Sequence, residues 1–221
     1  MTIPTFQIRQ CSNPACRFRF PVDVAALNQA GSRPDRCPRC GSPVQVMVDA
    51  YTNPKVLPAV PPENLPVVEA LLDNIRSAYN VGAMFRTADG AGLRHMHMAG
   101  ITPTPDHPKI VKTALGAENT VPWSTHANGL EAALALRGAG YHVWALEGGP
   151  CTVSLFEAAQ QMPDAPVLLV VGNEIAGVDP ALLDECEQVL SIPMQGEKHS
   201  LNVAIAFGIA AYVLRYGKTR S

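Results

Sequence analysis

The chain has 221 residues, enough for one medium-sized domain and a small second module. Hydrophobic residues make up 47% of the sequence and charged residues 16%, a composition that is typical of a globular protein and excludes an intrinsically disordered one. The net charge of −2 predicts no uniformly basic surface, and the lack of both an apolar run of about 18–20 residues and a signal peptide predicts a cytoplasmic protein without a membrane partner.

Charge is unevenly distributed along the chain. Residues 1–48 carry six arginines, no lysine and two acidic residues, a formal charge of +4, whereas the remainder carries −6. We therefore interpret residues 1–48 as a separate module. Residues 49–66 contain five prolines, which predicts an extended linker, and residues 67–221 form the main domain.

The N-terminal module contains four of the six cysteines, in the pattern C-x4-C followed by C-x2-C: Cys11, Cys16, Cys37 and Cys40. In a chain without a secretion signal, this spacing is typical of a tetrahedral structural zinc site. A module this short buries little core, so a bound Zn²⁺ would supply its folding energy. The alternative is a reduced or disulfide-paired arm.

Strand-like and helix-like segments alternate along the main domain. We expect strands at 67–73, 94–99, 141–147, 167–172 and 188–193. We expect helices at 80–91, 108–116, 128–138, 180–187 and 201–215. This alternation predicts an α/β fold with a mainly parallel sheet and helices on both of its faces.

Three of the expected strands end in loops that can bind a ligand. These loops are Glu147–Gly149, Gly172–Glu174 and Ile192–Met194. Parallel sheets bind their ligands at the carboxyl ends of the strands, where glycine lets a ligand approach the backbone. Neither a dinucleotide-binding motif nor a P-loop is present in the sequence, so neither a nicotinamide nor an ATP site is indicated.

The last expected helix is apolar on every side apart from Asn202. A helix of this kind must be buried on every side, which predicts that it packs against its own sheet and against a second subunit. Ser200 fits the N-cap position, and the Asn202 amide is either satisfied locally or faces a site.

Arg86 lies off the apolar face of the 80–91 helix, three residues before Asp89. It is therefore either a functional residue or half of a surface salt bridge worth less than about 1 kcal/mol. Asn80, taken alone, fits an ordinary helix cap.

Three segments of the main domain resemble the motifs of the SPOUT superfamily, in its TrmH/SpoU branch: residues 74–92, 168–179 and 190–203. Residues 114–123 between them fit the same branch. The resemblance implies transfer of a methyl group from S-adenosylmethionine to a ribose 2′-hydroxyl of tRNA or rRNA. It also implies a C-terminal trefoil knot and a homodimer. The zinc-ribbon-like module lies outside the common core of the branch.

The resemblance also implies roles for individual residues. It places Arg86 at the acceptor ribose with Asn80 as its companion. Three further residues complete the implied catalytic set: Glu174, Ser200 and Asn202. The implied cofactor wall consists of Leu146, Gly148, Gly172, Ile192, Met194 and Leu201. Because arginine stays protonated in proteins, we favour Arg86 as a stabiliser of alkoxide charge or a phosphate anchor over the family's usual proposal of a base.

The basic module is a candidate RNA-binding element. Its candidate contacts are Arg17, Arg19, Arg33, Arg36 and Arg39, with Phe18 and Phe20 positioned to stack on bases. The alternatives are that the two phenylalanines form a small core or that the module docks a protein. For the whole chain, the alternatives to a methyltransferase are a non-catalytic RNA-binding or assembly factor with a knotted domain and another small-molecule α/β enzyme.

Overall fold

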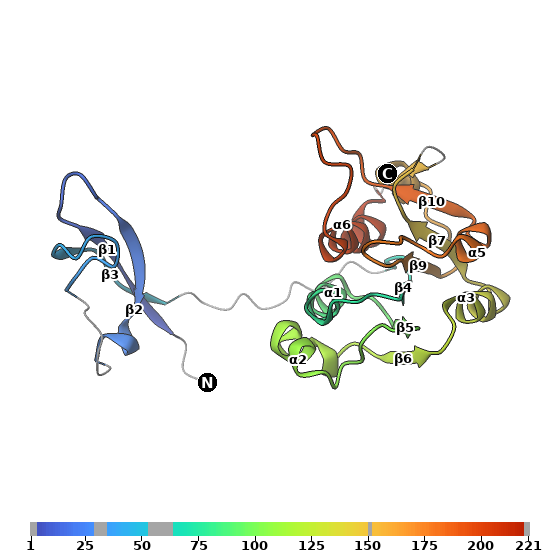
Figure 1. The fold of residues 1–221 in the computed structure, drawn as a ribbon, viewed down its shortest axis with the longest axis horizontal. Helices are drawn as coiled ribbons and strands as arrows, with labels where there is room; N and C mark the ends of the chain where they lie inside the picture. The colour runs from blue at the N-terminus through green and yellow to red at the C-terminus, as the bar shows by residue number, and fades with distance from the viewer. Residues whose placement is uncertain (1–3, 29–34, 53–63, 150–151, 219–221) are drawn as a thin grey trace. The chain divides into compact units, whose positions relative to one another are not determined.

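The computed structural model describes residues 4–28, 35–52, 64–149 and 152–218 (Figure 1). The chain divides into two compact units, Met1–Pro61 and Pro62–Ser221, which are described separately. Arg33 and most of the expected linker lie outside the described residues.

The N-terminal unit contains a three-stranded antiparallel sheet in the order β2-β1-β3. Its strands are β1 (Thr5–Cys11), β2 (Arg19–Asp23) and β3 (Val44–Thr52), and the short helix η1 (Val24–Asn28) follows β2. Strand β3 continues four residues past the expected end of the module at residue 48, so residues 49–52 belong to the sheet and not to a linker. Only Cys11 and Cys37 are fully buried among the described residues of this unit.

The second unit, the main domain, contains a seven-stranded sheet in the order β6-β5-β4-β9-β7-β10-β8, with every pair of neighbours parallel. The strands are β4 (Val68–Asp73), β5 (Met96–Ala99), β6 (Trp123–His126), β7 (His142–Leu146), β8 (Val153–Ser154), β9 (Val167–Val171) and β10 (Gln188–Ser191). The predicted α/β fold with a mainly parallel sheet is confirmed.

Helices cover both faces of this sheet, as Figure 1 shows. They are α1 (Ala78–Ala91), α2 (Pro108–Ala114), η2 (Ala117–Asn119), α3 (Gly129–Gly138), α4 (Leu155–Gln160), α5 (Pro180–Asp184) and α6 (Val203–Tyr216). One core lies between the sheet and α1, α2, α4 and α6, and a smaller core lies beneath α3 and α5. Strands β4 and β9 are buried along their whole length, which explains the continuous apolar sequence of β9, whereas β4 also carries the buried acidic residues Glu69 and Asp73.

The ends of two helices differ from the sequence-based expectation. The prediction of Ser200 as an N-cap is wrong, because α6 begins at Val203 and Asn202 accepts hydrogen bonds from the backbone N–H groups of Ala204 and Ile205. Likewise, Ser77 and not Asn80 caps α1, since its hydroxyl accepts a hydrogen bond from the Asn80 N–H at 3.3 Å. The Asn80 side chain is therefore available for other contacts.

Helix α6 is buried on one side only within the single chain. Phe207, Ala210 and Leu214 are fully buried, whereas the exposed fractions of Ile205 and Tyr212 are 57% and 47%. The expectation of burial on every side is therefore not met by the main domain alone. Among the described residues, no helix is both long and apolar enough to cross a membrane.

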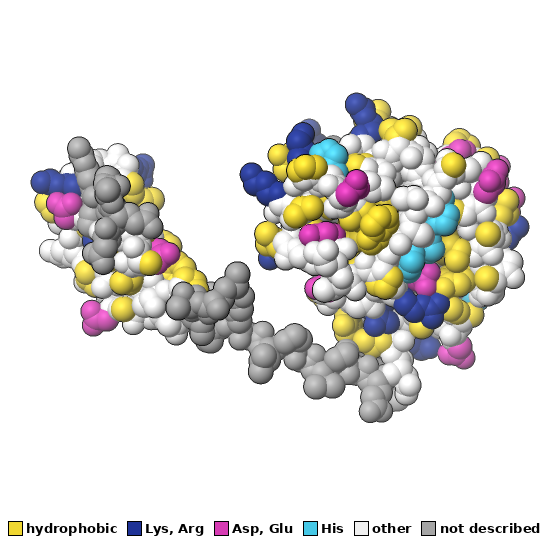
Figure 2. Space-filling model, turned by 90° about the horizontal axis from the view of Figure 1, so that it is seen from below, with side chains coloured by type: hydrophobic (Ala, Val, Ile, Leu, Met, Phe, Trp, Pro, Cys, Tyr) yellow, Lys and Arg dark blue, Asp and Glu magenta, His cyan; other side chains and the backbone are white. Residues whose placement is uncertain are grey.

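A polar cluster occupies the face of β4, β5 and β6 beside the smaller core. Glu69 accepts hydrogen bonds from Arg94 at 2.7 Å and from Tyr141 at 2.8 Å, and lies 3.0 Å from the Nε2 atom of His97. His97 in turn contacts His126 through ring nitrogens 3.0 Å apart. Figure 2 shows a group of histidine side chains on the surface of the main domain. Glu69 is thus buried with a full set of partners.

Candidate functional site

A pocket of about 390 Å³ lies at the carboxyl ends of β7, β9 and β10, beside the start of α6. All six residues expected in the cofactor wall line this pocket: Leu146, Gly148, Gly172, Ile192, Met194 and Leu201. Three of the five expected catalytic residues, Glu174, Ser200 and Asn202, line it as well. The topology therefore brings together loops that the sequence places up to about 50 residues apart.

The two glycines of the expected cofactor wall, Gly148 and Gly172, have different roles. A Cβ atom at Gly148 would meet no atom within 4 Å, so a side chain there would occupy open space in the pocket. At Gly172, a Cβ atom would lie 2.3 Å from the backbone nitrogen of Val178. Gly172 is thus required for the close packing of the 173–178 turn, and only Gly148 leaves space for a ligand.

Asn173 holds that turn and joins it to the end of β4. Its side-chain oxygen accepts hydrogen bonds from the N–H groups of Ile175 and Ala176, and its amide nitrogen donates to the carbonyl of Asn74 at 2.7 Å. Glu147 supports the turn from β7, because one of its oxygens accepts a hydrogen bond from the Val178 N–H at 3.0 Å. Sequence reasoning assigned no role to Asn173, although an asparagine after a glycine is a common turn signal.

Glu174 connects the pocket to the N-terminus of α1. Its two oxygens accept hydrogen bonds from the N–H groups of Arg76 and Ser77 at 2.9 and 3.0 Å, and from the Asn80 amide at 3.1 Å. Burial alone would raise the pKa of Glu174, but these N–H donors outweigh it and lower the pKa. Glu174 is therefore a carboxylate held at a helix N-terminus.

Asn80 also contacts the third expected motif. The Asn202 amide nitrogen donates to the Asn80 side-chain oxygen at 3.3 Å, while the Asn202 side-chain oxygen caps α6. Asn202 is thus satisfied locally as the cap of α6, and it also lines the pocket. Glu174, Asn80 and Asn202 form one hydrogen-bonded chain, the Glu174–Asn80–Asn202 chain, across three separate loops.

Arg86 lies apart from this chain of residues. It is exposed on α1, about 9 Å beyond Asn80 along the helix axis, and is absent from the lining of the described pocket. The expected ion pair with Asp89 is not formed within the described part of the chain, and Asp89 instead accepts a hydrogen bond from Thr120 at 2.7 Å. The Arg86 guanidinium is thus available to a ligand or to another chain.

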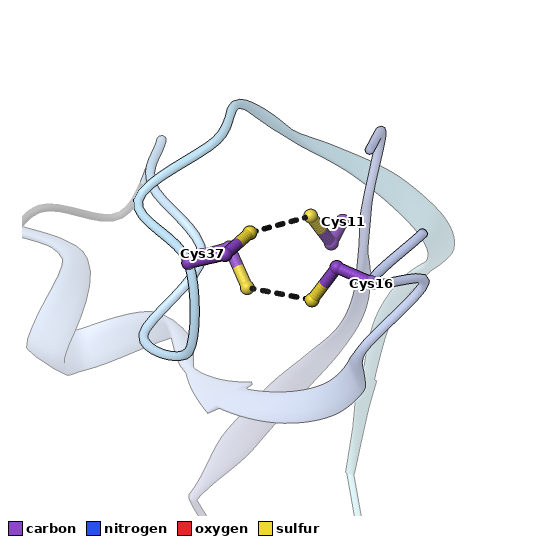
Figure 3. A group of neighbouring side chains, drawn as sticks. Cys11, Cys16 and Cys37 are labelled. Atoms are coloured by element: carbon purple, nitrogen blue, oxygen red, sulfur yellow. Dashed lines mark hydrogen bonds between the residues drawn. The ribbon is translucent and has the colours of Figure 1, made fainter. Parts of the chain in front are cut away.

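The four cysteines of the N-terminal unit converge, as Figure 3 shows for three of them. All four sulfur atoms lie within 4.8 Å of one another, with 3.4 Å between Cys11 and Cys40 and 3.9 Å between Cys16 and Cys37. Tetrahedral Zn²⁺ with Zn–S bonds of about 2.3 Å requires sulfur separations of about 3.8 Å, whereas a disulfide requires about 2.05 Å. The arrangement fits a metal site and not a pair of disulfides.

The backbone around this cluster supports the same interpretation. Gly41 adopts a φ of 71° and donates a hydrogen bond to the Cys37 carbonyl at 2.9 Å, which forms a tight turn after Cys40. Hydrogen bonds from Ser42 lower the pKa of Cys40 to about 6. Burial, in contrast, raises the pKa of Cys11 to about 12, so the case for a metal site rests on the sulfur geometry and not on the pKa values.

Four of the five expected RNA-binding arginines are exposed on the N-terminal unit: Arg17, Arg19, Arg36 and Arg39. Phe18 stacks on Phe20 with ring centroids 5.4 Å apart, and 37% of Phe18 is exposed. The phenylalanine pair is therefore not a sealed core, and one aromatic face remains accessible to solvent.

The fold and the site define an α/β protein with a pocket at the carboxyl edge of its parallel sheet. The chain belongs to the SpoU rRNA methylase family, whose model matches residues 68–212. It is 36% identical over 155 residues to the 23S rRNA (guanosine-2′-O-)-methyltransferase RlmB of Burkholderia sp, covering 68% of this chain and 59% of that relative. The chain thus spans less than two thirds of the length of this relative.

Solved structures of RNA methyltransferases are also similar to this chain. A putative RNA methyltransferase of the TrmH family from Porphyromonas gingivalis is similar with a TM-score of 0.62 and 30% identity, over 80% of this chain and 67% of that one. An AdoMet-bound rRNA methyltransferase from Sinorhizobium meliloti also has a TM-score of 0.62, with 29% identity, over 68% of this chain and 56% of that one.

Proposed function

We propose that the protein methylates a ribose 2′-hydroxyl of rRNA or tRNA in the cytoplasm, with S-adenosylmethionine as the methyl donor. The observation that carries this proposal is the Glu174–Asn80–Asn202 chain, which joins all three expected motifs beside the pocket. Similarity to a 23S rRNA 2′-O-methyltransferase and to an AdoMet-bound rRNA methyltransferase supports the same activity.

The pocket fits S-adenosylmethionine in size and in chemistry. Leu146, Ile192 and Leu201 offer apolar contacts to a flat base, and the space beside Gly148 admits a ligand close to the backbone. The other proposed wall residues are Gly172 and Met194. When bound, the donor supplies an electrophilic methyl group, so the protein has to position the hydroxyl and stabilise the charge that develops on its oxygen.

In this proposal, Arg86 acts on the acceptor ribose. A guanidinium stays charged and presents a planar set of donors, so it stabilises the developing alkoxide or anchors a phosphate. Because Arg86 lies outside the pocket lining of its own chain, we propose that the ribose bridges the pocket and α1. Asn80, Glu174, Ser200 and Asn202 position the loops around it.

A homodimer is the proposed assembly. The exposed fractions of Ile205 and Tyr212 on α6 leave an apolar helix face for a second subunit to cover. We also propose the C-terminal trefoil knot that the family resemblance implies.

The N-terminal unit is proposed to bind structural Zn²⁺ through its four cysteines and to contact RNA through its exposed arginines. With four thiolates on one Zn²⁺, the unit keeps a modest positive charge, which favours phosphate contacts. Deleting residues 1–48 should raise the dissociation constant for RNA and leave that for S-adenosylmethionine unchanged. An unchanged RNA affinity would instead indicate a protein-docking module.

The experiment that tests the proposed function has two parts. Titration calorimetry of zinc-replete protein measures the binding of S-adenosylmethionine, and transfer of a labelled methyl group to unmodified rRNA and tRNA transcripts measures activity. Mapping of the labelled ribose then identifies the substrate. Absence of donor binding by folded protein would overturn the proposal, and binding without transfer would favour the non-catalytic RNA-binding or assembly factor.

A further inference from the structure

Methylation of a ribose hydroxyl requires an acceptor for its proton, and this inference rests on the proposed function. The hydroxyl is a poor nucleophile until it loses the proton, so a positioned base is worth about 10²–10⁴ in rate. Arg86 is unsuited to that task because a guanidinium stays protonated at neutral pH. A second residue near the ribose therefore has to accept the proton, and the pocket is one side of that position.

Only three titratable side chains line the described pocket: Glu147, Glu174 and His199. The other lining residues are apolar residues, glycines, serines and asparagines, none of which accepts a proton at neutral pH. The choice of base within the pocket is thus a choice among these three.

Both carboxylates are already engaged in holding the loops. Glu174 accepts hydrogen bonds from three N–H groups, of Arg76, Ser77 and Asn80, and its pKa is lowered, which makes it a weaker base than an ordinary glutamate. Glu147 accepts hydrogen bonds from the N–H groups of Gly148 and Val178, each at 3.0 Å. Proton uptake by either residue would weaken the bonds that shape the pocket.

His199 differs from both. It lies in the exposed loop directly before Ser200, and it makes no hydrogen bond or ion pair with any residue in the described part of the chain. Both ring nitrogens are therefore available to a substrate. Histidine is also the side chain whose ordinary pKa lies nearest neutrality, where a general base works best.

We propose that His199 accepts the proton of the ribose 2′-hydroxyl. As the 2′-oxygen forms its bond to the methyl carbon, the carbon–sulfur bond breaks and its electron pair stays on sulfur. The hydroxyl proton moves to a ring nitrogen of His199 and then to water, which the exposed position of the loop admits. Arg86 remains charged throughout and stabilises the developing alkoxide. Proton acceptance and charge stabilisation are thus assigned to two different residues.

The test compares His199→Asn and His199→Gln with the control Lys198→Gln, which changes the neighbouring loop residue outside the pocket lining. Labelled methyl transfer to unmodified rRNA and tRNA transcripts is measured between about pH 5.5 and 9, and S-adenosylmethionine binding is measured by calorimetry. We expect both His199 variants to lose about 100-fold or more in kcat near neutral pH and to bind the donor within about threefold of the parent.

The pH profile separates a base from a merely structural residue. The parent and Lys198→Gln should lose activity on the acidic side as an imidazole is protonated, and the His199 variants should lack that transition. An unchanged kcat and profile in the variants would overturn the inference, as would a loss confined to donor affinity with an unchanged kcat at saturating donor. If the parent transfers no methyl group at all, the proposed function fails, which is a distinct result.

Discussion

Asn202 donates a hydrogen bond from its amide nitrogen to the Asn80 side-chain oxygen across 3.3 Å, although 122 residues separate the two in the sequence. Asn80 donates in turn to Glu174, so a single amide connects the entrance of α1 with two pocket loops. Neither asparagine has to touch a substrate to matter, because the position of each loop depends on the other two.

Replacing Asn80 tests this coupling. Asn80→Ala removes the bonds to both Glu174 and Asn202, so we expect kcat to fall about tenfold or more through misplacement of the loops. Steady-state methyl transfer at saturating donor measures the effect. The control Tyr79→Ala changes the exposed neighbouring residue on α1 and should remain close to the parent. Equal rates for both variants would show that the hydrogen-bonded chain has no functional role.

The space beside Gly148 allows the donor pocket to be blocked selectively. A side chain at this position meets no protein atom, so Gly148→Val should leave the melting temperature unchanged and weaken donor binding about tenfold or more by occupying the pocket. Gly138→Val adds the same side chain in open space on α3 and serves as the control. Titration calorimetry measures the donor affinity of both variants. An unaltered affinity in Gly148→Val would show that the donor does not bind beside Gly148.

Arg86 should affect the reaction without affecting donor binding. Loss of the guanidinium in Arg86→Ala should lower the rate of methyl transfer about 100-fold or more. Because Arg86 lies outside the pocket lining, the dissociation constant for the donor should change little. Arg86→Lys should also be poor, since a point charge does not reproduce the planar guanidinium. Turnover equal to that of the parent in Arg86→Ala would remove the residue from the mechanism.

The cluster around Glu69 makes the stability of the main domain depend on pH. Burial opposes ionisation of Glu69, but hydrogen bonds with His97, Arg94 and Tyr141 outweigh it and lower its pKa to about 2. A carboxyl whose folded pKa lies below its unfolded value of 4.5 stabilises the fold above pH 4.5 and loses that contribution as the pH falls toward 2.

The neighbouring histidines act in the same direction at higher pH. Burial lowers the pKa values of His95 and His126 from 6.5, so the unfolded chain binds protons first and stability falls as the pH drops below 6.5. Urea unfolding followed by tryptophan fluorescence reports the main domain alone, because both tryptophans lie in it. We expect Glu69→Gln to cost about 1–3 kcal/mol at pH 7 and to flatten the pH dependence below 4.5. A parent curve that is flat between pH 6.5 and 2 would contradict this account.

Metal removal should affect the two units differently. We expect one zinc ion per chain by mass spectrometry, and a strong chelator or Cys37→Ser should unfold the N-terminal unit because little else is buried there. Donor binding by the main domain should persist. Cys186→Ser, outside the cluster, should retain the ion. Resistance to chelators combined with sensitivity to reducing agents would indicate disulfides instead.

Much of the fold could be predicted from local sequence pattern. Strand β9 is a continuous apolar run, β4 is apolar apart from Glu69 and Asp73, and the apolar repeat of α1 from Val81 to Ala88 identifies its buried face. Strand β6, which is polar, and helix α4, which has six residues, gave no such signal and were missed. Strand β8 was missed as well, because it has only two residues.

Most residues of the site could be predicted from sequence motifs, whereas the contacts between them could not. The three pocket loops were predicted from the carboxyl ends of the strands, and the individual wall residues from the family resemblance. The cap of α6 was misplaced because Ser200 and Asn202 are both good capping residues and only the backbone decides between them. The start of α1 was also misplaced, because the predicted helix began at residue 80 with Asn80 as its cap, whereas Ser77 caps α1 in the structure. No local pattern indicates that Asn80, Glu174 and Asn202 bond to one another, since that depends on the packing of the whole domain.

The position of β9 between β4 and β7 has a consequence for biosynthesis. Both neighbours precede it in the chain, so a nascent polypeptide leaving the ribosome presents the paired strands β4, β5 and β6 and the single strand β7 with unpaired edges until residues 167–171 emerge. Open edges of this kind invite pairing between chains, and contacts over long sequence separations form slowly. Yield of native material should therefore rise when translation is slowed by cooling, because each newly made chain then has longer to insert its central strand before it meets another.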